Sequence, residues 1–271
     1  MEELNIDAEH LVTNKYLFSE GLLCKLKYFF VTLGDERTIL SLGDFLQRLH
    51  TMKVLQIRGH GAWLPKEQVE NGMMVEMREA KYQLEHILIE ESSVTNNLVI
   101  LRVEGCDRLV NLVPSSTSFQ NLTNLVVSCC KRLKIVLTSS IAKTLVRLRY
   151  MEIASCDKIK EIVLGDDVVA QDEVITFREL KELKLLDLKS LTSFCSGNCA
   201  FKFPSLERLV VDDCPDMKIF SEGNLSTPKL HEVQRGSEAR FACKGDLNTT
   251  IQKVYIFLNN QLFPSHSKSL T

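Results

Sequence analysis

Four cysteines occupy equivalent positions in four similar stretches of the sequence, LRVEGC, LVVSCC, MEIASC and LVVDDC, as Cys106, Cys130, Cys156 and Cys214. A thiolate can act as a nucleophile, a redox centre or a metal ligand when it is accessible and a neighbouring group lowers its pKa. A fifth stretch, LKLLDL, carries Leu188 at the same position, and leucine has none of these reactivities. The position therefore favours a small buried apolar group, and free cysteine behaves as one.

Other arrangements of reactive residues give only weak indications of chemistry. Cys195 and Cys199 are four residues apart in FCSGNC, but no second cysteine pair and no histidine lies nearby in the sequence to complete a zinc site. Cys129 and Cys130 could form a vicinal disulfide, but alternation along a strand would turn one inward and the other to solvent. The sequence also lacks a G-x-S-x-G nucleophile motif. We therefore expect neither an enzyme nor a bound metal or cofactor.

Composition argues against several classes of partner. The chain has 271 residues, of which 45% are hydrophobic and 25% are charged, and its formal net charge is −2. It has no long run of Lys and Arg, so nucleic acid is not expected as a partner. The N-terminus lacks the apolar segment of a secretion signal, and no stretch of about 18 uncharged apolar residues follows it. We expect a cytoplasmic protein with reduced thiols and no membrane insertion.

The cysteine positions belong to an internal repeat of the form L-x-x-L-x-L-x-x-C-x-x-L-x-x-L. The L-x-L core alternates with period two, which predicts a short strand with one buried face. Each unit can bury that face only against the next unit, so stacked units form a solenoid. We predict an α/β leucine-rich-repeat horseshoe, with a parallel β ladder on its concave face and irregular or short helical segments on its convex side. Five strong copies begin at Leu98, Leu122, Leu148, Leu180 and Leu206.

Aromatic residues recur in register with this repeat. Phe119, Phe177 and Phe203 each precede the first leucine of a copy by three residues, and Leu145 takes that place in another copy. Stacked units would bring these side chains next to one another. We therefore expect them to form a buried spine.

The strength of the repeat divides the chain into four parts. Residues 1–20 are a weakly patterned N-terminal edge, and residues 21–94 contain degenerate repeats with a helical insertion. The regular repeats occupy residues 95–235. Residues 236–271 contain a capping helix, which Asp246 can begin, and a loose tail. Weaker repeat copies begin at Leu26, Met52 and Leu84.

Three long stretches resemble the C-terminal leucine-rich-repeat region of plant intracellular disease-resistance proteins, the nucleotide-binding, leucine-rich-repeat receptors of the coiled-coil type. They are FQNLTNLVVSCCKRLKIVLTSSIAKTLVRLRYMEIASCDKIKEIV, FKFPSLERLVVDDCPDMKIFSEGNLSTPKLHEV and GDLNTTIQKVY, and the likeness extends over about residues 95–257. The chain departs from the family in lacking the phosphate-binding G-x-x-x-x-G-K-[ST] motif.

The resemblance implies a protein-recognition module of plant innate immunity, with a ligand-sensing or autoinhibitory role. Its partners would be a pathogen effector or a guarded host protein, and a nucleotide-binding receptor module in cis or in trans. The cysteine-bearing repeat also occurs in substrate receptors of ubiquitin ligases. A leucine-rich-repeat scaffold or ligase adaptor is therefore the alternative.

The x positions of the predicted strands would share the concave face, where repeat proteins usually bind their partners. These side chains have mixed charge, which suits a protein partner better than a phosphate backbone or a lipid surface. The candidate partner-binding residues are Gln56, Arg58, Arg102, Glu104, Tyr150, Glu152, Glu182, Lys184, Arg208 and Asp212.

Overall fold

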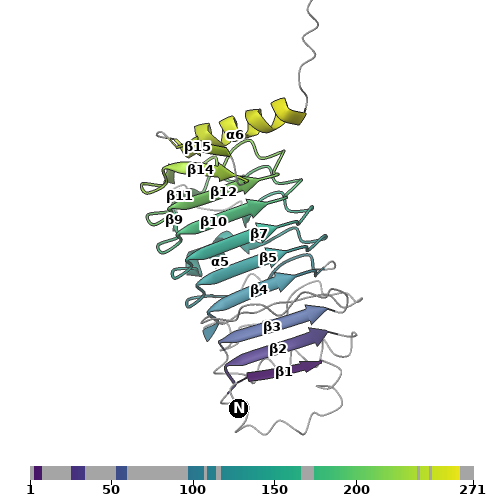
Figure 1. The fold of residues 1–271 in the computed structure, drawn as a ribbon. Coiled ribbons are helices and arrows are strands. Elements are labelled where there is room, and N and C mark those ends of the chain that lie inside the picture. The colour runs from purple at the N-terminus through teal and green to yellow at the C-terminus, as the bar shows by residue number, and fades with distance from the viewer. Residues whose placement is uncertain are drawn as a thin grey trace, which may run out of the picture.

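The fold is a solenoid with a ten-stranded sheet along its length, as a computed structural model of the chain shows (Figure 1). The structure describes residues 3–7, 26–33, 53–59, 97–106, 109–113, 117–165, 174–236, 239–243 and 246–262. The predicted leucine-rich-repeat solenoid with a parallel ladder is confirmed. Nine strands pair in parallel, each with the next: β1 Glu3–Asp7, β2 Tyr28–Leu33, β3 Val54–Gly59, β4 Ile100–Glu104, β5 Asn124–Ser128, β7 Tyr150–Ala154, β10 Glu182–Leu186, β12 Arg208–Asp212 and β14 Glu232–Arg235.

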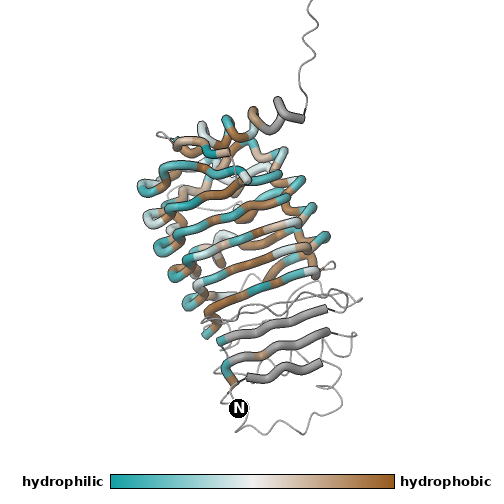
Figure 2. The backbone as a smooth tube through the Cα atoms, in the orientation of Figure 1, coloured by the Kyte–Doolittle hydropathy of each residue, from teal (hydrophilic) through white to brown (hydrophobic). Residues whose placement is uncertain are grey.

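The ladder buries one face because apolar residues alternate along each strand. In β4, Leu101 and Val103 are buried, whereas the residues between and beside them are half-buried. The register aligns equivalent repeat positions, so that Leu101 pairs with Leu125, and Leu125 with Met151. These side chains form the core between the sheet and the return segments. In Figure 2 the strands carry most of the hydrophobic stretches, and the turns at the edge of the sheet are mostly hydrophilic.

The opposite side of the solenoid is built from short elements. One three-stranded parallel sheet and one two-stranded parallel sheet lie there. A six-residue helix follows the first short strand. Thr138 caps this helix through its side chain, which accepts a hydrogen bond from the Ile141 amide. The elements are β6 Leu137–Thr138, α5 Ser139–Thr144, β8 Val163–Leu164, β9 Val174–Thr176, β11 Ala200–Lys202 and β13 Leu225–Ser226.

Phenylalanines fill the core between the two sides. Phe119, Phe177 and Phe203, the residues of the predicted spine, are all buried. The rings of Phe177 and Phe203 stack with centroids 5.3 Å apart. A second stacked pair, Phe194 and Phe220, lies 4.7 Å apart and meets the first pair edge to face. The aromatic repeat positions therefore hold neighbouring coils together.

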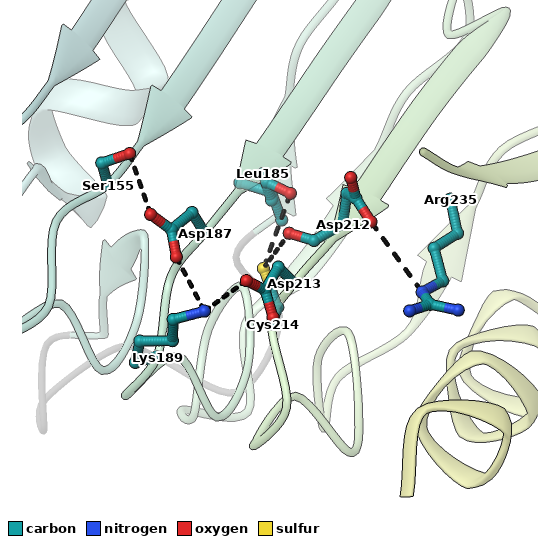
Figure 3. A network of polar contacts seen from close by, with 8 residues as sticks. All are labelled: Ser155, Leu185, Asp187, Lys189, Asp212, Asp213, Cys214 and Arg235. Carbon is teal, nitrogen blue, oxygen red and sulfur yellow. Dashed lines mark hydrogen bonds and ion pairs between the residues drawn. The ribbon is translucent and has the colours of Figure 1, made fainter. Parts of the chain in front are cut away.

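The residue after each of six ladder strands adopts a positive φ, which turns the chain away from the sheet. In four of these residues, Gly105, Cys129, Ser155 and Asp187, the backbone amide extends the ladder by one more bond, as in Asp187 N to Asp212 O at 2.9 Å. Four side chains along this edge are joined, because Asp187 accepts from Ser155 Oγ at 3.1 Å and pairs with Lys189, which also pairs with Asp213 (Figure 3). The six residues are Gly105, Cys129, Ser155, Asp187, Asp213 and Gly236.

This turn also explains the paired cysteines. Cys129 is exposed and Cys130 is buried, and neither forms a disulfide. The expected reason, alternation along a strand, is wrong, since β5 ends at Ser128 and Cys129 is the left-handed turn residue.

The C-terminal end of the ladder is covered by a strand and a helix. β15 Ala239–Ala242 pairs antiparallel with β14, and α6 Leu247–Leu262 follows. The carboxylate of Asp246 accepts hydrogen bonds from the amides of Asn248 and Thr249, so it caps α6 as its type and position predict. On the face turned to the solenoid, Leu247, Ile251 and Val254 are buried.

The weak repeat copy that begins at Leu84 lies outside the described residues. In the ladder, β3 pairs directly with β4, with Leu55 opposite Leu101. The copy at Leu84 therefore adds no strand between them. The four predicted domain boundaries stay predictions.

Candidate functional site: the ladder face

The ladder face is the side of the sheet that carries the x positions of the repeats, opposite the core. Strand alternation forces successive residues to opposite sides, so every L-x-L triplet contributes its middle residue to this face. The parallel register then places these residues in one row across the sheet. That row is Arg102, Val126, Glu152, Lys184 and Val210.

Five of the predicted partner-binding residues form one connected network on β7, β10 and β12. Lys184 Nζ lies 3.0 Å from Tyr150 Oη, 3.6 Å from Glu152 Oε2 and 3.5 Å from Glu182 Oε1. Tyr150 also donates to Glu152. Arg208 Nη1 lies 3.3 Å from Glu182 Oε1. The Lys184 ammonium additionally lies 5.1 Å from the centre of the Tyr150 ring, a cation–π distance.

The network shifts the pKa of two of its members, Tyr150 and Lys184. Burial and the hydrogen bond to Glu152 raise the pKa of the Tyr150 hydroxyl. The hydrogen bond to Tyr150 and the carboxylates on either side raise the pKa of Lys184. At neutral pH the surface therefore presents a neutral phenol and a charged ammonium, held in place by three neighbouring strands.

The other predicted residues lie outside this network. Arg102 and Glu104 are on β4, two strands away from β7. Gln56 and Arg58 lie on β3, whose backbone pairs with β2 and β4. Asp212 is on β12, but its Oδ1 lies 3.8 Å from Nε of Arg235, on β14, and no ion pair joins the described side chains of Asp212 and Arg208. The predicted set thus divides into a central network and two flanking groups.

Sequence reasoning missed two residues of the ladder face, Val126 and Val210. Each occupies the middle x position of its strand, yet each is only 7% exposed. The signal was present in the sequence as LVV, where an apolar residue replaces the usual polar x. The two valines are therefore buried apolar residues that lie beside the charged groups of the ladder face.

The four repeat cysteines and Leu188 are buried, as the repeat position predicts. Each thiol donates to the carbonyl oxygen two residues before it, for example Cys156 Sγ to Ala154 O at 3.2 Å. Hydrogen bonding between neighbouring thiols, together with burial, raises the pKa of Cys130 and of Cys156. Burial raises the pKa of Cys214 to about 12. The thiols of Cys130, Cys156 and Cys214 are therefore protonated and unreactive at neutral pH.

A metal site is not built by the residues that the structure describes. Among them, no group of three or more His, Cys, Asp or Glu side chains is placed to hold an ion. Cys195 and Cys199 are both buried beside Gly197, and burial raises the pKa of Cys195 to about 12. Within the same residues, no helix has the length and apolar character needed to cross a membrane.

A comparison with known proteins finds a match for the region that carries most of the ladder face. Residues 114–222 match the family described as plant disease resistance protein RPS2-like, leucine-rich repeats. The chain contains a leucine-rich-repeat region of the plant disease-resistance family. The matched residues of this resistance-type repeat region include β5, β7, β10 and β12.

Two curated relatives extend the match. A putative disease resistance protein of Arabidopsis thaliana is 30% identical over 217 residues, which are 79% of this chain and 15% of that protein. A probable disease resistance protein of the same plant is 28% identical over 118 residues, or 43% of this chain and 13% of that protein. The resistance-type repeat region thus spans about a seventh of the length of the curated relatives that it matches.

Proposed function

We propose that the chain recognises a protein partner through its ladder face in plant defence, as a non-catalytic module. The partner would be a pathogen effector or a guarded host protein. The observation that supports this proposal is the network on the ladder face. Hydrogen bonds and ion pairs there join five side chains across three neighbouring strands, those of Tyr150, Glu152, Glu182, Lys184 and Arg208. Aromatic and arginine side chains that neighbours hold in place are the groups that dominate binding energy in protein interfaces.

The composition of the ladder face suits a protein surface. It carries charges of both signs, so a partner with complementary charges can be selected and a uniform polyanion is not attracted. Val126 and Val210, which are buried, lie between these charges. A surface that combines charged, polar and apolar residues is typical of protein interfaces.

In a full-length receptor, the same face would couple recognition to signalling. A nucleotide-binding module, present in cis or in trans, would be held inactive by contact with the repeats. A ligand that binds only the released arrangement shifts the equilibrium toward it by its differential affinity for the two states. Ligand sensing and autoinhibition are then two consequences of one surface.

A two-hybrid screen against libraries of pathogen effectors and plant host proteins tests the proposal. Tyr150→Ala and Lys184→Glu should each weaken binding of a recovered partner by about tenfold or more, the effect of removing a hot-spot residue. The matched control is Lys158→Glu, which makes the same charge change at an exposed turn residue after β7. Partners that bind both ladder-face variants as strongly as the wild type would show that recognition lies elsewhere.

A further inference from the structure

Arg102 differs from the other described cations of the ladder face in having no partner. Lys184 pairs with two carboxylates, Arg208 with Glu182, and Arg235 with Asp212. For Arg102, no ion pair joins the guanidinium to any residue that the structure describes. Its Nε atom is buried and makes no hydrogen bond. A guanidinium N–H that is removed from water without an acceptor costs free energy. Arg102 is therefore a hydrogen-bond donor whose acceptor is missing.

The register explains why the face itself supplies no acceptor to Arg102. The paired position on β5 is Val126, which has no polar atom. The next position in the row is Glu152 on β7, two strands away, or about 9–10 Å at the usual spacing of strands. Glu152 is already held by Lys184 and Tyr150. Arg102 is therefore a cationic residue of the ladder face whose neighbour in the row, the buried Val126, supplies no carboxylate.

We propose that Arg102 receives the carboxylate of an Asp or Glu side chain from a protein partner. The inference rests on the proposed function and names the chemistry of the partner. Arginine binds a carboxylate through two parallel N–H bonds, which define direction as well as charge.

The charges around Arg102 select a single carboxylate over a polyanion. On β4 to β12 the predicted ladder-face residues supply three cations, Arg102, Lys184 and Arg208, against the four anions Glu104, Glu152, Glu182 and Asp212. A nucleic acid or a run of phosphates that reached Arg102 would also approach these carboxylates and be repelled. One acidic residue within a largely apolar segment meets the cation and avoids the repulsion.

A displayed library of random dodecapeptides, panned on the whole chain, provides the probe. Peptides that the wild type retains should carry an Asp or Glu, and replacing it by Asn or Gln should weaken binding by about tenfold or more. Arg102→Gln should produce the same loss, whereas Arg132→Gln, the same change at an exposed turn residue after β5, should not. Arg102→Glu should regain a peptide in which the acidic residue is replaced by Lys. Circular-dichroism melts verify that each variant is folded.

The outcomes separate the two proposals. If Lys184→Glu abolishes peptide binding but Arg102→Gln does not, the ladder face recognises peptides and the assignment to Arg102 is overturned. If neither change weakens binding, or the wild type retains no peptide, both proposals fall. If replacing the acidic residue by phosphoserine strengthens Arg102-dependent binding about tenfold, the ligand is a phosphopeptide and the carboxylate assignment is overturned. A loss with Arg102→Gln and its reversal by the charge exchange support the inference.

Discussion

Cys214 shows why cysteine recurs at one repeat position. Its sulfur lies 3.4 Å from the carbonyl oxygen of Asp212 and 3.5 Å from that of Leu185, where the chain leaves the strand and carbonyl groups turn inward. A thiol fills the small space and is a weak donor to such carbonyls. Leu188 fills the equivalent space without a donor. The position selects for volume first and for hydrogen bonding second.

Burial of the repeat thiols leads to a labelling prediction. Iodoacetamide at pH 8 should modify Cys129, which is exposed, and leave Cys130, Cys156 and Cys214 unmodified in the native protein. All four should react in denaturant, because reaction requires an accessible thiolate. Mass spectrometry of peptides from the two conditions measures this, with Cys129→Ser as the control for peptide assignment. Rapid native labelling of the three repeat cysteines would contradict their placement.

A pair of substitutions on β4 tests the strand register. Val103 is fully buried, so Val103→Asp places a carboxylate in the core and should lower the free energy of unfolding by several kcal/mol. Arg102→Glu, one residue earlier on the ladder face, should change it by no more than about 0.5 kcal/mol. Urea unfolding followed by circular dichroism measures both. The reverse order of the two effects would mean that the register is shifted by one residue.

The helix α6 illustrates how one element closes the solenoid. Its second residue, Asn248, accepts hydrogen bonds from the amides of Phe220 and Ser221 and donates to the Ser221 carbonyl at 2.8 Å. These backbone groups belong to the last regular coil and have no following coil to pair with. The side chain of Asn248 takes the place of that missing neighbour.

Capping by Asp246 gives a prediction for α6. Burial alone would raise the pKa of the Asp246 carboxyl, but hydrogen bonds from Thr249 and Asn248 outweigh it and lower the pKa below its ordinary value. The ionised cap therefore stabilises the fold at pH values above the unfolded pKa, and its contribution is lost as pH falls through the lower folded pKa. At pH 7, Asp246→Ala should cost about 1 kcal/mol, and Asp246→Asn should cost less because asparagine also caps.

Thermal melts at pH 7 and pH 2.5 measure this contribution. The difference between the wild type and Asp246→Ala should shrink at the lower pH. An unchanged difference would show that the carboxylate does not act as the cap.

The approach of two return segments at Gly223 makes a steric prediction. A Cβ atom at Gly223 would lie 2.1 Å from the carbonyl oxygen of Cys199, and backbone cannot move aside as a flexible side chain can. Gly223→Ala should therefore destabilise the fold by about 1–3 kcal/mol or more. At Gly197 the nearest atom would lie 3.4 Å away, so Gly197→Ala is the control and should be mild. Equal melting temperatures for the two variants would contradict this packing.

At the scale of the whole molecule, stability comes from contacts between neighbouring coils. Each ladder strand pairs only with the strand before and the strand after it, and the two stacked pairs of phenylalanines, Phe177 with Phe203 and Phe194 with Phe220, join adjacent coils. Such a solenoid behaves as a chain of coupled units, and a defect in one coil loosens its neighbours. The large ladder face can therefore vary in its x residues while the core positions keep the coils stacked.

The absence of a phosphate-binding motif from the sequence gives the prediction at this scale. The chain by itself should not bind ATP, because no G-x-x-x-x-G-K-[ST] loop is present to surround the phosphates. Isothermal titration calorimetry with Mg-ATP should show no binding isotherm. Micromolar affinity would reveal a nucleotide site of another kind.

The sequence by itself determined the repeat, the strand positions and the burial of the repeat cysteines, because these depend on a local periodicity that recurs in every coil. It also predicted the cap at Asp246 from one residue type and the helical pattern after it. Only the tertiary structure decided which charged residues meet. Tyr150, Lys184 and Arg208 are 24 to 58 residues apart in the chain, and the lengths of the intervening return segments bring them together.

The same dependence on register left Arg102 opposite Val126 and without a carboxylate. The repeat pattern likewise did not predict the antiparallel strand β15 or the hydrogen bonds of Asn248 to the backbone of Phe220 and Ser221. Both satisfy backbone groups at an end of the solenoid, where the repeat stops. Direct pairing of β3 with β4 could not be read from the eroded copies either. Periodicity specifies what each coil buries, whereas contacts between coils depend on which coils become neighbours.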